Sequence, residues 1–155
     1  MVLHDEHRVP ALRQPADLRI VVSSIQLVAE DHHWESWANL PAERNRFLQL
    51  IRDTGANGIL IISGDRHHGE LSALRSGVSY PLYDITASGL NRGWKKPKNE
   101  HNRHRIGDLY VDDHFGMIEI DRAGGAPLLR LQLRDVEGAV VLSHDVPLAD
   151  LAVTR

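Results

Sequence analysis

The chain has no cysteine among its 155 residues, which excludes disulfides, cysteine-based zinc sites and thiol catalysis. Any metal site must therefore use His, Asp, Glu or Asn with water, and ten histidines are the one unusual count. Long apolar runs are lacking too: residues 59–62 fall far short of the roughly 20 residues of a membrane span. The first eight residues lack the apolar core of an export signal.

A strong excess of charge of either sign is also lacking. The formal net charge of -3 and a pI near 6.3 give no reason to expect a specific nucleic-acid partner. With 42% hydrophobic and 25% charged residues, the composition is typical of a soluble globular protein and argues against disorder. The length suits one domain.

The first half of the chain reads as a β-α-β unit. Residues 1–17 are polar, contain Pro10 and Pro15, and are expected to form a poorly structured lead-in to a domain over residues 18–155. Residues 18–25 and 58–62 are continuous apolar strands, which predicts burial on both faces of a sheet covered by helices. After a loop at 26–40, a helix is expected over 41–54, opened by Pro41 and stopped by Gly55. The two strands should be parallel.

The second half is dominated by strand signals. We expect a strand at residues 80–87 and a long exposed loop at 91–102. Strands at 115–121, 128–134 and 139–142 follow, separated by glycine turns, and predict an antiparallel meander. The fold class is therefore expected to be α/β, a β-α-β unit followed by antiparallel strands.

The sequence SGDRHHGE at residues 63–70 is the strongest chemical feature. It follows a buried strand, and ligands bind beyond the carboxyl ends of parallel strands in open α/β sheets. Asp65 and His67 could lean into one cavity there and each bind a metal ion. The alternative is that Asp65 caps the loop while His67 and His68 are solvated, because a bare Gly-Asp-x-His is a weak pattern.

Three segments, SGDRHHGEL, YPLYDITASGLN and NRHRIGDLYVDDHFGMIEID, occur in this order and carry a family resemblance. Together they resemble the C-terminal half of the PhoD-like (alkaline phosphatase D) metallophosphatases, in the calcineurin-like metallophosphoesterase superfamily. The resemblance covers residues 12–135. It implies the C-terminal half of a calcineurin-like metallophosphoesterase sandwich. It also implies hydrolysis of a phosphomonoester or phosphodiester, with a phosphorylated small molecule among the substrates and with iron and calcium as the metals.

The resemblance also implies site residues. The family's Gly-Asp-x-His motif supplies two metal ligands, which map onto Asp65 and His67, and the family's following glutamate maps onto Glu70. Asn91 and His104 lie in two further matching segments and are expected to line the substrate cleft. In two places this sequence departs from the pattern: Gly69 replaces a small apolar residue, and His114 replaces Asn.

Two further polar residues are expected near the substrate. Arg66 lies between the two predicted ligands and could stabilise phosphate charge, although alternation along an extended loop would point it away. Gln26 ends the first strand at the edge that carries Asp65, so it could contact the substrate or support a ligand.

The loop containing His32, His33 and Trp34 could grip the organic group of a phosphoester by stacking. The alternative is a solvated loop with Trp34 or Trp37 packed on the sheet edge.

The superfamily's N-terminal metal motifs are not recognisable in residues 1–17, and His4, Asp5 and His7 read as a tail. We therefore expect a truncated phosphatase, inactive alone unless a complementing N-terminal chain completes the site. The strand at 18–25 would then be an uncovered edge that favours self-association. The alternatives are a non-catalytic remnant, or an anion-binding module built on the basic loop of Lys95, Lys96, Lys98, His101 and His104. The sequence does not set localisation, although the family is often exported.

Overall fold

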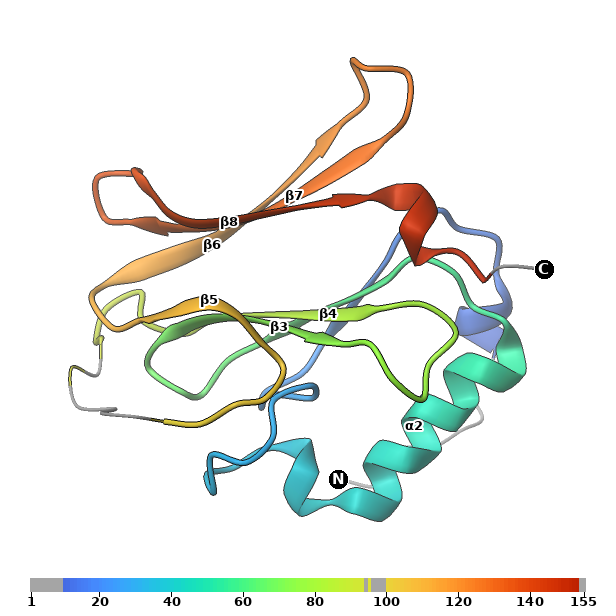
Figure 1. Ribbon diagram of the computed structural model, residues 1–155, viewed down its shortest axis with the longest axis horizontal. Helices are drawn as coiled ribbons and strands as arrows, with labels where there is room; N and C mark the ends of the chain where they lie inside the picture. The colour runs from blue at the N-terminus through green and yellow to red at the C-terminus, as the bar shows by residue number, and fades with distance from the viewer. Residues whose placement is uncertain (1–9, 94, 96–99, 154–155) are drawn as a thin grey trace.

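The computed structural model describes residues 10–93, 95 and 100–153 (Figure 1). Its elements are β1 (Arg19–Val22), η1 (Trp37–Asn39), α2 (Pro41–Thr54), β2 (Ile59–Ser63), β3 (Gly69–Leu74), β4 (Leu82–Ala87), β5 (Arg105–Tyr110), β6 (His114–Asp121), β7 (Leu128–Asp135), β8 (Val140–Pro147) and η2 (Leu148–Leu151). A five-stranded mixed sheet has the order β1-β2-β4-β3-β5, and a three-stranded antiparallel sheet has the order β6-β7-β8. The predicted α/β class and meander are confirmed.

The predicted β-α-β unit is present, with β1 and β2 paired in parallel. Helix α2 has the expected bounds: Pro41 occupies its first turn, and Gly55 ends it in the left-handed conformation at φ 62°. Phe47, Leu48 and Ile51 form its buried face. Among the described residues, no helix combines the length and apolar character needed to span a bilayer.

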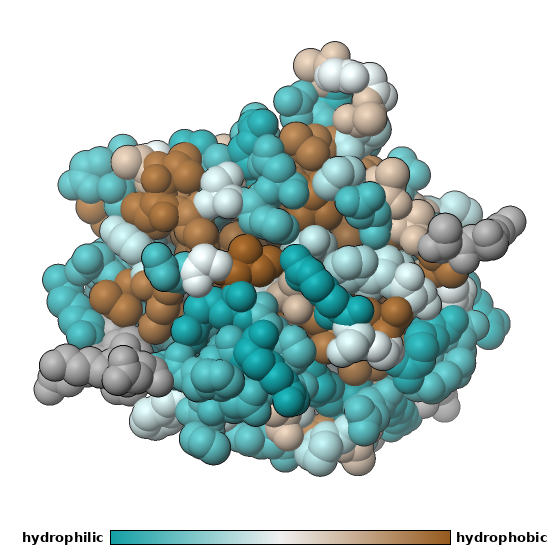
Figure 2. All heavy atoms as spheres, in the orientation of Figure 1, coloured by the Kyte–Doolittle hydropathy of each residue, from teal (hydrophilic) through white to brown (hydrophobic). Residues whose placement is uncertain are grey.

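The two sheets and the helix form three layers, with α2 on one side of the five-stranded sheet and the three-stranded sheet on the other (Figure 1). β6 contacts β3 and β4, and β5 contacts β8. One continuous core joins these layers, from Phe47 and Ile51 on the helix through Leu60 to Leu131 and Leu133 on β7. Figure 2 shows apolar residues gathered where the two sheets meet, whereas polar residues dominate the side that carries α2.

Two strands, β3 and β5, were not predicted from the sequence. β3 is buried at all six positions although it contains Gly69, Glu70 and Ser72. Its polar side chains can be buried because they are hydrogen-bonded inside the protein. The sequence of β3 therefore lacks the apolar pattern that marks a buried strand. β5 is partly exposed and interrupted by Gly107 at φ 70°, which weakens the alternation expected of a strand.

The first strand differs from the prediction of burial on both faces. β1 lies at the edge of the five-stranded sheet and alternates between half-buried and exposed, with Ile20 50% and Val22 77% exposed. Among the described residues no strand pairs with the outer edge of β1, in agreement with the predicted uncovered edge. The loop predicted to be exposed at residues 91–102 ends at Asn102, which is buried. Of the predicted lead-in, residues 1–9 lie outside the described residues, while residues 10–13 are helical and place Leu12 in the core.

Candidate functional site

The loop after β2 exposes two of the predicted site residues and buries the one between them. Asp65 and His67 both have left-handed backbone conformations, with φ of 73° and 54°, and both are exposed. Arg66 between them is only 4% exposed. The loop thus alternates exposed residues in the left-handed conformation with a buried one. Asp and His adopt the left-handed conformation more readily than most residues.

Asp65, Arg66 and His67 line one pocket of about 660 Å³, together with Trp34, Glu35, Arg92 and Gly93. The pocket lies beyond the carboxyl end of β2, which pairs in parallel with β1 on one side and β4 on the other. This is the edge at which open α/β sheets bind ligands. Three of the predicted site residues are thus together at a position suited to a ligand.

The ring of His67 is held by Arg92, another residue that lines this pocket. Its Nδ1 lies 3.1 Å from the carbonyl oxygen of Arg92. A carbonyl only accepts hydrogen bonds, so Nδ1 carries the proton and Nε2 of the neutral ring keeps its lone pair. Metal-binding histidines are commonly oriented in this way by a backbone carbonyl. The geometry therefore suits His67 to bind a metal ion through Nε2.

Arg66 forms a buried ion pair with Glu100, with 2.5 Å between the guanidinium Nη2 and the carboxylate Oε1. The guanidinium also lies over the indole of Trp34, 5.5 Å from the ring centroid. Its charge is already balanced inside the protein. Arg66 consequently supports the pocket wall formed by Trp34.

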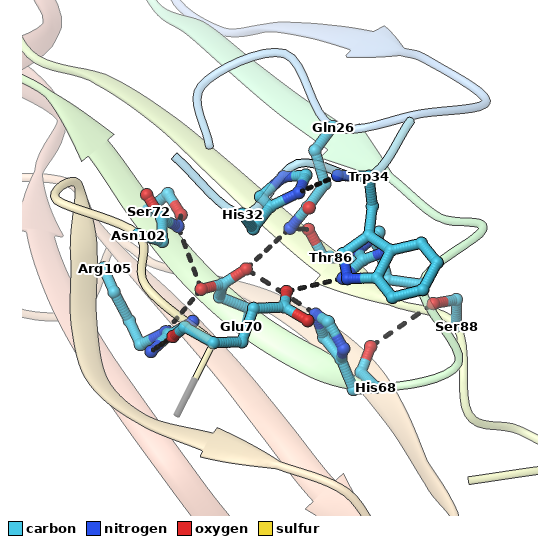
Figure 3. Close-up of polar contacts among 12 residues, drawn as sticks. Gln26, His32, Trp34, His68, Glu70, Ser72, Thr86, Ser88, Asn102 and Arg105 are labelled. Carbon is cyan, nitrogen blue, oxygen red and sulfur yellow. Dashed lines mark hydrogen bonds and ion pairs between the residues drawn. The ribbon is translucent and has the colours of Figure 1, made fainter. Parts of the chain in front are cut away.

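Behind the loop lies a buried polar network centred on Glu70 (Figure 3). The Glu70 carboxylate accepts hydrogen bonds from Gln26 at 2.7 Å, Asn102 at 2.9 Å and Arg105 at 2.5 Å. Burial alone would raise the pKa of Glu70, but the neighbouring His68 ring, the charge of Arg105 and the Asn102 amide outweigh it and hold the pKa at about 2. Glu70 is therefore a buried anion that ties β3 to β5 and to the loop after β1.

A second buried carboxylate, Asp84 on β4, continues the network. Gln26 donates to the Thr86 hydroxyl at 2.9 Å, and the Ser63 hydroxyl lies 2.8 Å from Thr86. The Ser63 hydroxyl donates its single proton to Asp84 at 2.6 Å. The Thr86 hydroxyl must therefore donate to Ser63. Asp84 also accepts the backbone N–H groups of Leu27 and Val28. Burial raises the pKa of Asp84, and this effect outweighs the hydrogen bonds, which lower it.

The network ties Ser63, the last residue of β2, to Asp84 and Thr86 on β4, so it fixes the root of the loop that carries Asp65 and His67. Sequence reasoning found Glu70 and Gln26 but missed Asp84, Thr86 and Arg105. One signal was available: Asp84 interrupts the apolar run Leu82-Tyr83-Asp84-Ile85, and a carboxylate within a buried strand needs partners.

The remaining predicted site residues lie elsewhere. Asn91 is exposed and does not line the pocket of Asp65. His104 lines a different pocket of about 910 Å³, beside Glu30, Arg44 and Arg103. Burial and the nearby charges of Arg103 and Arg44 lower the pKa of His104. Glu30 forms ion pairs with both Arg44 and Arg103, so the charges of these two arginines are balanced within the protein.

The two departures from the family pattern, Gly69 and His114, face each other. His114 is fully buried, and a Cβ added at Gly69 would lie 2.9 Å from its Nε2. Gly89 gives the other side of the ring similar room, since a Cβ there would lie 2.3 Å from Cε1. The larger side chain at position 114 therefore fits because position 69 has none.

Asp65 and His67 supply a carboxylate oxygen and an imidazole nitrogen, donors that suit transition metals and harder divalent ions. Within the described part of the chain, no three His, Asp or Glu residues are grouped so that they could hold a metal ion. Asp65 and His67 are therefore two candidate donors that do not make a complete metal site within these residues.

No protein-family profile and no curated protein sequence matches the chain. Among solved structures, the fold is similar to one titled "Structure of PhoD", with a TM-score of 0.53 and 15% sequence identity. The match covers 92% of this chain but 31% of that one. The chain therefore has the fold of part of a PhoD structure and spans less than a third of its length.

Proposed function

We propose that this chain forms part of a metal-dependent phosphoester hydrolase, with Asp65 and His67 as metal ligands. One observation carries the proposal: both side chains are exposed in a single pocket beyond the carboxyl end of a parallel strand. The fold shared with part of a PhoD structure supports it. So does the contact of His67 Nδ1 with the Arg92 carbonyl, because it leaves Nε2 as the ring atom available to a metal ion.

Phosphomonoesters and phosphodiesters are the proposed substrates, and iron and calcium the proposed metals. Such metals bind phosphate oxygens and make water nucleophilic at neutral pH. The residues of the chain orient these partners: the Arg92 carbonyl fixes the tautomer of His67, and the network at Glu70 and Ser63 fixes the loop. Arg92 adds a positive side chain to the pocket that receives the phosphate.

Two ligands do not hold a two-metal centre, so the proposed site requires further ligands from outside the described residues. A complementing chain or segment is the proposed source. β1, the exposed edge of the five-stranded sheet, is a place where further strands could pair.

Hydrolysis of p-nitrophenyl phosphate and bis-p-nitrophenyl phosphate, with Fe, Mn or Ca added, tests the proposal. Once a complementing chain supplies the further ligands, we expect metal-dependent turnover that His67→Ala and Asp65→Ala abolish. His101→Ala and Asp108→Ala, which change exposed residues outside the pocket, are the matched controls. Metal binding without turnover would instead identify a non-catalytic remnant. Anion binding that ignores both metal and Asp65→Ala would identify an anion-binding module.

A further inference from the structure

The loop that carries Trp34, another residue lining the pocket, is built in the same unusual way as the loop that carries Asp65 and His67. The positive φ values at non-glycine residues in the described ranges occur at Asp31, His33, Asp65 and His67. Each pair flanks one buried residue, His32 in the first loop and Arg66 in the second. Such backbone conformations cost free energy and cluster where a site requires a fixed geometry.

This geometry presents Trp34 to the pocket. The Trp34 backbone N–H donates to Nδ1 of the buried His32 at 3.1 Å, and its carbonyl accepts from the Asn39 side chain at 2.8 Å. The residue is 46% exposed, an unusual exposure for so large an apolar side chain. The nearby Trp37 instead packs on Phe47 and donates to Ser23. The sequence left open whether these aromatic residues stack on a ligand or pack on the protein. Trp37 packs on the protein, whereas Trp34 lines the pocket.

The indole of Trp34 packs against a buried, ion-paired side chain. Arg66 lies over the ring, and the 2.5 Å ion pair with Glu100 holds Arg66 in turn. A rigid aromatic surface loses little conformational entropy when a ligand binds, and planar rings stack on such surfaces.

We propose that Trp34 is a stacking surface that selects phosphoesters with a planar aromatic group, namely nucleotides or aryl phosphates. The phosphate lies toward Asp65, His67 and Arg92, and the aromatic group lies on the exposed part of the indole. This specificity rests on the proposed phosphoester function of the same pocket, and it adds the class of organic group that the pocket accepts.

Binding measured by titration calorimetry in the presence of Mn²⁺ tests the proposal without catalysis. Phenylphosphonate is compared with methylphosphonate, and adenosine monophosphate with ribose 5-phosphate. We expect the wild-type protein to bind the aromatic member of at least one pair about 5- to 100-fold more tightly, the range that aromatic stacking supplies. Preference in the first pair alone identifies aryl phosphates, and preference in the second identifies nucleotides.

Trp34→Ala should remove this preference, Trp34→Phe should retain part of it, and the matched control Trp37→Phe should keep it. Equal affinities within both pairs, a preference that survives Trp34→Ala, or no binding of any probe overturns the proposal. Methylphosphonate and ribose 5-phosphate separate its failure from failure of the phosphoester function. If Asp65→Ala leaves their binding unchanged, the metal-site proposal is wrong whatever Trp34 does.

Discussion

His67 Nδ1 lies 3.1 Å from the carbonyl oxygen of Arg92, and this contact joins the two walls of the candidate site. It also decides the chemistry of the ring, because a protonated Nδ1 leaves Nε2 as the atom that can bind a metal ion. The ring is thereby oriented by the backbone of a loop distant in sequence.

Stability should depend on pH through Glu70. The pKa of this carboxyl is about 2 in the folded protein, below its ordinary value of 4.5, so the ionised form stabilises the fold. The contribution, on the order of 3 kcal/mol, is fully present above about pH 5 and is lost as the pH falls toward 2. Urea unfolding of wild type and Glu70→Gln between pH 7 and pH 2 measures it.

Glu70→Gln should lower the free energy of unfolding by about 3 kcal/mol at pH 7, because Arg105 loses its buried partner. The substitution should also flatten the dependence of the free energy of unfolding on pH. Glu137→Gln, at an exposed glutamate, is the control and should change neither. An unaltered acid limb in Glu70→Gln would contradict the assignment.

Gly69 and His114 should be energetically coupled. In Gly69→Ala the new Cβ would lie 2.7 Å from Leu133 Cδ1 and 2.9 Å from His114 Nε2, so we expect a loss of about 1–3 kcal/mol. His114→Asn makes room, and the double variant should be more stable than the sum of the two single changes predicts. Chemical denaturation of the four proteins measures the coupling, and strict additivity would show that the contact is unimportant.

Replacing left-handed residues by glycine should stabilise the loops. His33 at φ 64° and His67 at φ 54° are exposed, and glycine adopts these conformations without strain. We expect His33→Gly to raise the free energy of unfolding by up to about 1 kcal/mol, and His67→Gly to raise it less, because that change also removes the hydrogen bond of the ring to the Arg92 carbonyl. His67→Gly should also weaken metal binding, whereas His33→Gly should not. Destabilisation by both glycines would show that the loops are not strained.

The exposed edge of β1 should drive self-association. Ile20 and Val22 present apolar side chains on an edge strand, a surface that proteins usually protect with charge. We expect sedimentation velocity to show oligomers that grow with concentration, and the double variant Ile20→Lys/Val22→Lys to remain monomeric. Val136→Lys, at another exposed apolar residue, should not alter association. A wild-type monomer at all concentrations would contradict this prediction.

The sequence predicted those elements whose local signals agree with their environment. Pro41 and Gly55 mark the two ends of α2, and the glycine turns mark the meander. β3 was missed because Glu70 and Ser72 are buried through partners as distant as Asn102 and Arg105, which no local pattern reveals. β1 was assigned to the sheet interior because the apolar run does not reveal that it is an edge strand.

For the site, the position of Asp65, Arg66 and His67 after a buried strand was enough to predict that they lie together at one pocket. The roles of Arg92 and Trp34 depend on loops that meet only in three dimensions, so spacing in the sequence could not show them. His104 was grouped with the substrate cleft by segment resemblance, yet it lines another pocket with Glu30.

Titration of the protein with Mn²⁺, followed by electron paramagnetic resonance, tests the central claim most directly. Mn²⁺ should bind to the wild-type protein, and Asp65→Ala and His67→Ala should each weaken its affinity at least tenfold with no loss of folded structure, since both side chains are exposed. His101→Ala and Asp108→Ala should bind Mn²⁺ as the wild-type protein does. Equal affinity in all five proteins would contradict the assignment of Asp65 and His67 as metal ligands.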